Sequence, residues 1–157
     1  MTAFPSLQLA AIMPMPDHVI WIDSDGSINQ LSHNEAGDRL DHEPVLFCHR
    51  RWTMSKLKHN PDSLSGLDLL ELYAFVHPAR FAVPTAGGLA TALGLSSHND
   101  AEDQTILMPV IADTLLEHIA SWPEKQQHIA SQMARFMAAG GWGWAPMVLH
   151  ACGEDMP

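Results

Sequence analysis

The chain has little of several residue types that mark particular classes of protein. Its 157 residues include only two cysteines, Cys48 and Cys152. Two cysteines cannot make a disulfide framework or a zinc site, so we expect a reducing, cytoplasmic compartment. Apolar runs end at a charge or a proline well short of the ~18 residues that a membrane span needs, and no membrane contact is expected. Residues 1–15 contain no Lys or Arg, which a secretory signal would need at its start.

Basic side chains are also scarce. Eight Lys and Arg residues stand against 18 Asp and Glu residues, and the formal net charge of −10 disfavours attraction of phosphates by the surface as a whole. Half of the basic residues nevertheless fall in one segment: Arg50, Arg51, Lys56 and Lys58. This clustering predicts a local contact with nucleic-acid phosphates. The alternative is a solvated helix face whose charge is balanced by nearby acids.

Two catalytic signatures are missing from the sequence. There is no Gly-x-x-x-x-Gly-Lys-Ser/Thr phosphate loop, so this chain cannot be an ATPase motor by itself. There is no Gly-x-Ser-x-Gly elbow either, and Cys48 follows an apolar run, which favours a core residue over a nucleophile.

The pattern predicts one α/β domain over residues 1–157, with strands early and helices late. β-Branched and aromatic residues predict a strand over 18–23, and Asp25-Gly26 predicts a hairpin turn into a strand over 27–31. A third strand is expected over 45–49. Helices are expected over 52–58, 67–77, 89–93, 101–121 and 123–139, followed by an irregular docked tail with one helical turn. These elements together predict a sheet that is covered by helices.

Two groups of residues could bind a metal ion or move a proton. Asp23 and Asp25 lie two residues apart after the first expected strand, and two carboxylates can share a divalent cation. A plain hairpin turn is the alternative. His98 lies five residues before Asp103 at the start of the long helix, where an ordinary helix start is the alternative.

Five segments occur in a recognisable order. They are a strand ending in Asp23-Ser-Asp25, a strand over 44–49, the run Gly-Leu-Asp-Leu-Leu-Glu-Leu over 66–72, a run over 84–95 that ends in Leu-Gly-Leu, and the spacing from His98 to Asp103. This order resembles the DnaQ-like 3′–5′ exonucleases of the ribonuclease H-like fold. The resemblance covers residues 18–121 and implies a mixed sheet flanked by helices. Residues 122–157 are then a helical, Trp-rich extension.

Two stretches carry a closer similarity. Residues 67–85 and the run Gly-Trp-Gly-Trp-Ala-Pro over 141–146 are similar to the N-terminal region of alphaproteobacterial DinG-type ATP-dependent DNA helicases. In those proteins an exonuclease-like region precedes the motor. The similarity implies an accessory domain whose partner is a helicase motor in the same or another chain.

The resemblance also implies roles for single residues. Asp23, Asp25 and Asp103 fall on the metal-binding acids, and His98 falls on the general base; Mg²⁺ or Mn²⁺ would be the ion. The family's second-motif Asp falls on Thr53, which has no carboxylate. Weakened metal binding costs transition-state stabilisation, so we expect little or no nuclease activity and no bound ion.

We therefore expect a non-catalytic or weakly active exonuclease-like domain that helps a DNA helicase engage DNA, with single-stranded DNA among its partners. Two alternatives stay open. One is an active metal-dependent 3′–5′ exonuclease, and the other is a protein-interaction module without DNA contact. Trp142 and Trp144 are expected to anchor the tail on the core, and docking to a partner or stacking on bases is their alternative role.

Overall fold

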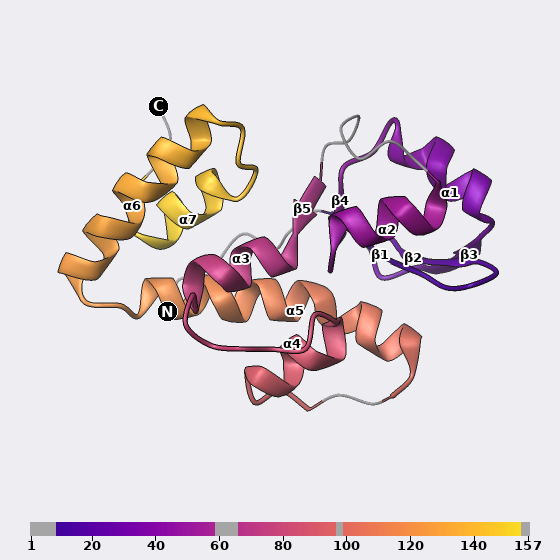
Figure 1. The fold of residues 1–157 in the computed structure, drawn as a ribbon, viewed down its shortest axis with the longest axis horizontal. Coiled ribbons are helices and arrows are strands. Elements are labelled where there is room, and N and C mark those ends of the chain that lie inside the picture. The colour runs from indigo at the N-terminus through magenta and orange to yellow at the C-terminus, as the bar shows by residue number, and fades with distance from the viewer. Residues whose placement is uncertain (1–8, 59–65, 97–98, 155–157) are drawn as a thin grey trace.

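The computed structural model describes residues 9–58, 66–96 and 99–154, and shows one mixed sheet with helices on both faces (Figure 1). Within these ranges the sheet has five strands: β1 (Ala10–Pro14), β2 (Val19–Ile22), β3 (Ile28–Leu31), β4 (Val45–Phe47) and β5 (Gly66–Asp68). The helices of the same ranges are α1 (His33–Leu40), α2 (Arg50–Leu57), α3 (Leu69–Val76), α4 (Ala86–Ala92), α5 (Ala101–Ala120), α6 (Glu124–Ala139) and α7 (Ala145–Ala151). The predicted α/β class and the mainly helical C-terminal half are confirmed.

The strand order is β3-β2-β1-β4-β5. β2 runs antiparallel to both of its neighbours, β1 and β3, whereas β4 is parallel to β1 and β5 is parallel to β4. β1 is therefore the central strand, and β2 alone runs against the other four.

Side chains that alternate along the strands build a separate core on each face of the sheet. In β1, Ala10 and Ile12 face the core formed with α1 and α2, whereas Ala11 faces the core formed with α3, α4, α5 and α7. The long helix α5 crosses β1, β2 and β4 and also contacts α3, α4 and α7. In Figure 1, α6 and α7 lie at the end of the molecule opposite α1 and α2.

Three predicted features of the chain are wrong in detail. The strand β1 precedes the first strand that we expected, so the strand predicted over 18–23 is the second one, β2. Residues 66–68, which include the start of a predicted helix, form β5 because they pair with β4. The tail over 145–151 forms the helix α7, which is longer than the single turn expected.

In the described part of the chain, no helix combines the length and the apolar character that crossing a bilayer requires.

Two adjacent glycines in α4 differ in the space around them. A Cβ atom at Gly88 would lie 2.2 Å from the backbone oxygen of Val83, whereas at Gly87 its nearest neighbour would be the flexible side chain of Gln104 at 3.0 Å. We predict that Gly88→Ala lowers the free energy of unfolding by about 2 kcal/mol or more, because backbone must move. Gly87→Ala, the matched control, should change it by less than about 1 kcal/mol. Urea unfolding measures both, and equal effects would contradict the prediction.

A pair of histidines joins α3 to α5. The Nε2 atom of His77 lies 3.0 Å from Nδ1 of His118, and the Tyr73 ring packs on His77 at 5.5 Å between centroids. Burial lowers the pKa of His77, and the neighbouring charges of His118 and Arg80 lower it further.

This shift predicts a pH dependence of stability. The unfolded chain binds a proton at residue 77 more readily than the folded chain, so the free energy of unfolding should fall as pH drops through the ordinary histidine pKa of 6.5. His77→Gln should reduce that pH dependence between pH 7 and 5, whereas His42→Gln, at an exposed position, should leave it unchanged. Urea titrations at several pH values test this. If the free energy of unfolding of His77→Gln fell with decreasing pH as steeply as that of the wild type, the prediction would be contradicted.

Candidate nucleic-acid interface

The carboxyl ends of three parallel strands meet at one edge of the sheet. β1 ends at Pro14, β4 is followed by Cys48, and β5 ends at Asp68. Ligand sites of open α/β sheets form at this kind of edge. α2 and α3 both begin here, directly after β4 and β5, so the starts of these helices frame the candidate site.

Asp68 joins the elements around this edge. Its carboxylate accepts hydrogen bonds from the backbone N–H of Arg50 (2.9 Å) and of Glu71 (3.1 Å), at the first turns of α2 and α3. Its backbone carbonyl accepts a bond of 2.7 Å from the indole Nε1 of Trp144. With 8% of its surface exposed, Asp68 is a structural carboxylate whose charge is stabilised by backbone donors.

A hollow of about 480 Å³ opens beside Asp68. Its walls come from the start of α2 and from α3, and are formed by His49, Arg50, Arg51, Asp68, Leu70, Glu71 and Ala74. A second hollow of about 710 Å³ shares Arg50 and Glu71 and continues toward residues 140–143. Basic groups on the α2 side therefore face acidic groups on the β5–α3 side.

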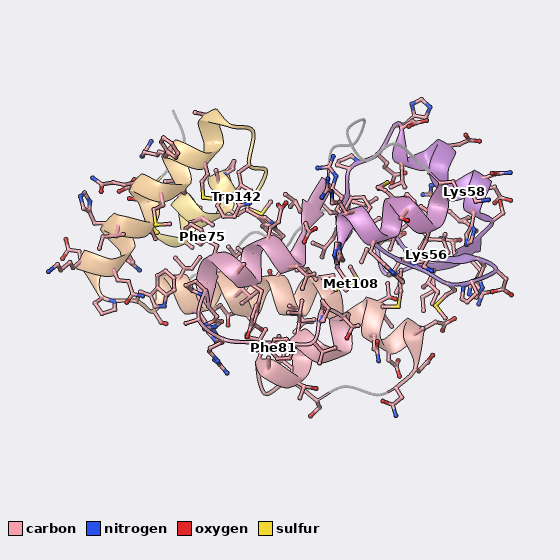
Figure 2. All side chains as sticks on the ribbon, viewed as in Figure 1. Lys56, Lys58, Phe75, Phe81, Met108 and Trp142 are labelled. Carbon is pink, nitrogen blue, oxygen red and sulfur yellow. The ribbon has the colours of Figure 1, made fainter. Side chains whose placement is uncertain are left out.

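The tail closes one side of this region. Trp142 packs on Phe75 of α3, with 4.9 Å between ring centroids (Figure 2), and hydrogen-bonds to Glu71. Burial raises the pKa of Glu71 and the charge of Asp68 raises it further, whereas Trp142 and Arg50 lower it. Trp144 is completely buried. Trp144 therefore anchors the tail, and its burial does not fit the alternative role of partner docking; Trp142 keeps part of its surface exposed.

The outer face of α2 and its C-terminal end carry most of the basic residues that we predicted to contact nucleic acid. Arg51, Lys56 and Lys58 are exposed, and Trp52 between them is 47% exposed. The ammonium of Lys56 lies 5.6 Å from the centroid of the Trp52 ring. Figure 2 shows Lys56 and Lys58 at the end of the molecule opposite Trp142 and Phe75. Thr53 points the other way, since only 2% of its surface is exposed.

Asp23 and Asp25 lie away from the carboxyl edge. β2 is antiparallel to β1 and its last residue pairs with Ala11, so Asp23 lies at the opposite edge of the sheet from Asp68. Its carboxylate accepts hydrogen bonds from Arg39 (3.0 Å), Trp21 (3.2 Å) and Asn29 (2.9 Å). Asp25 accepts from the backbone N–H of Ser27 in the exposed turn, and this bond lowers its pKa.

The remaining predicted site residues are on or near α5. Asp103 lies in the first turn of α5, and His98 lies outside the described residues. No group of three or more His, Cys, Asp or Glu side chains within 9–58, 66–96 and 99–154 is placed to hold a metal ion. Metal ligation by Asp23, Asp25 and Asp103 and base catalysis by His98 stay predictions.

The sequence contained signals for three residues that we did not single out, Asp68, Glu71 and Trp52. Asp68 and Glu71 have the Asp-x-x-Glu spacing of a capping box, and Asp68 indeed caps α3. Trp52 and Lys56 are four residues apart on a segment predicted to be helical, which places them on one face.

Comparisons of this chain with protein-family models, with curated proteins and with solved structures gave no match. We therefore infer its function from the strand order and from the residues around α2 and β5.

Replacing Asp68 should destabilise the fold more than replacing an ordinary helix cap. Asp68→Ala removes the cap of α3 and the acceptor for the N–H of Arg50, so we expect a loss of about 2–4 kcal/mol in the free energy of unfolding. Asp68→Asn keeps one acceptor oxygen and should lose less. Asp100→Ala removes a single exposed cap at α5 and should cost about 1 kcal/mol. Urea unfolding ranks the three variants, and equal losses for the two alanine variants would contradict this role.

Proposed function

We propose that this chain is a non-catalytic, exonuclease-like domain that helps a DNA helicase engage single-stranded DNA. The observation that carries the proposal is the strand order β3-β2-β1-β4-β5, with β2 alone antiparallel to the rest. The ribonuclease H-like fold has this order and these directions, with helices on both faces. The order supports the resemblance drawn from residues 18–121 and adds β1 to it.

The residues of β1 support a domain that binds DNA without cleaving it. In DnaQ-like exonucleases an early strand carries an Asp-x-Glu pair, whereas β1 reads Ala-Ala-Ile-Met-Pro and has no carboxylate. Asp23, which the resemblance aligned with the first acid, follows β2 and is bound by Arg39. Thr53 stands in place of another acid. Two-metal phosphoryl transfer needs carboxylates that hold two ions ~4 Å apart, so these replacements favour a domain that no longer cleaves.

The charge distribution supports a contact with DNA at one place. Residues 44–61 contain Arg50, Arg51, Lys56 and Lys58 and no acid, whereas all 18 Asp and Glu residues share the rest of the chain with the other four basic residues. A strand would therefore be attracted to α2 and repelled elsewhere.

Under this proposal the helicase motor, in the same or another chain, supplies the ATP hydrolysis for which this sequence has no phosphate loop. A cytoplasmic location belongs to the same proposal.

A protein-interaction module without DNA contact is the second candidate. One face of α6 exposes three large apolar side chains at helical spacing: Ile129 (51%), Met133 (50%) and Phe136 (83%). Exposed apolar patches of this kind mark protein contacts.

A combined cleavage and binding experiment tests the proposal. A 5′-labelled single strand is incubated with the chain and Mg²⁺ or Mn²⁺, and binding to the same strand is measured in EDTA. We expect binding in EDTA and no shortening of the strand beyond that seen with Asp103→Asn.

The controls separate the candidates. Glu102→Gln changes a neighbouring acid in the same first turn of α5 and is the matched control for Asp103→Asn. Shortening by the wild type and by Glu102→Gln, but not by Asp103→Asn, would overturn the non-catalytic assignment. No binding at low salt would overturn DNA engagement and favour the interaction module.

A further inference from the structure

We propose that Trp52 is a platform on which a base of a single-stranded nucleic acid stacks, with Arg51 and Lys56 contacting the phosphates beside it. This inference rests on the proposed function and names the ligand and the binding mode of the outer face of α2.

The exposure of Trp52 is the first observation. All five tryptophans lie in the described ranges, and Trp52 is the only one whose side chain is exposed. Trp21 and Trp144 are completely buried in the two cores. Trp52 therefore contributes little to either core, and 47% of its surface remains open to a ligand.

The charges around the ring are the second observation. Lys56 lies one helical turn from Trp52 with its ammonium 5.6 Å from the ring centroid, and Arg51 is adjacent in sequence and exposed. An exposed indole ring with a cation over it and a second cation next to it in the chain matches a nucleotide, whose base is flat and whose phosphate is anionic. An acidic peptide would satisfy the cations but would leave the ring without a stacking partner, so we favour nucleic acid.

The third observation is that the hollow beside α2 adjoins the face that carries Trp52. Arg51 lies on the exposed surface next to Trp52 and also lines the hollow of about 480 Å³ together with His49 and Arg50. Asp68 and Glu71 line the facing wall of this hollow, so a strand backbone would follow the α2 wall, where Arg51 precedes Trp52 in the chain. Stacking contacts are tolerant of sequence, because every base has a face that stacks.

The test compares strands that have the same charge but differ in their bases. Affinity is measured for oligo-dT, for an abasic deoxyribose-phosphate strand of the same length, and for oligo-rU. We expect the wild type to bind oligo-dT at least about fivefold more tightly than the abasic strand, which corresponds to ~1 kcal/mol of stacking. Trp52→Ala should abolish this preference, and Trp52→Phe should keep part of it. The ratio of oligo-dT to oligo-rU affinity identifies DNA or RNA as the source of the strand.

Matched variants separate stacking from charge. Phe136→Ala removes another exposed aromatic side chain, on α6, and should leave the preference unchanged. The single variants Arg51→Gln and Lys56→Gln should each weaken binding to the oligo-dT and abasic strands alike. Each lost phosphate contact should reduce the slope of log affinity against log salt by about 0.7. Lys125→Gln, on α6, controls for net charge.

The outcomes distinguish this inference from the proposed function. Equal binding of oligo-dT and abasic strands, or a preference that survives Trp52→Ala, would overturn the stacking platform while leaving DNA engagement intact. No binding of any strand would overturn both. Because Trp52 is half-exposed, its variants should unfold within about 1 kcal/mol of the wild type, which urea titration checks.

Discussion

The hydrogen bonds of Asp68 hold together the region on which the candidate interface depends. A carboxylate at the end of a three-residue strand accepts one N–H group from the first turn of each of two helices, and the carbonyl of the same residue accepts the indole N–H of Trp144. The start of α2, the start of α3 and the docked tail are thus fixed relative to one residue. Because β5 pairs with β4 alone among the strands that the structure describes, its position in the sheet would otherwise depend on very few contacts.

This geometry also explains why the acids within residues 9–58, 66–96 and 99–154 form no cluster that could hold a metal ion. The parallel ends of β1, β4 and β5 converge beside α2, but β1 contributes apolar residues there, and the carboxylate of Asp68 is already bonded to two backbone donors. Asp23 is held at the opposite edge by Arg39, Trp21 and Asn29. The described carboxylates therefore mainly stabilise turns and helix starts, and the exposed charge beside the carboxyl edge comes from the basic groups of α2 and from Glu71 of α3.

The sequence predicted the order of strands and helices better than the identity of the central strand. Runs with clear periodicity and turn signals, such as those over 101–121 and 18–31, form the expected elements. β1 escaped prediction because Ala10 and Ala11 have little strand preference and their strand is stabilised by pairing on both sides. Residues 66–68 follow β4 in the sheet although Leu67, with the leucines that come after it, resembles the start of a helix. The basic cluster was visible in the sequence, but α2 is too short for its pattern to show that Trp52 is exposed and Thr53 is buried.

The separation of charge along the chain bears on how such a domain would meet DNA. A surface with a net charge of −10 does not attract a strand from a distance, so association through the α2 face alone would be slow and sensitive to salt. Attachment to a motor that already holds DNA removes this difficulty, because it raises the local concentration of strand near α2. Under the proposed function, the surrounding acids would then limit the strand to the face that carries Arg51, Trp52 and Lys56. Under the proposed function, an acidic domain with a single basic face is therefore suited to guiding a strand delivered by its partner rather than to finding DNA on its own.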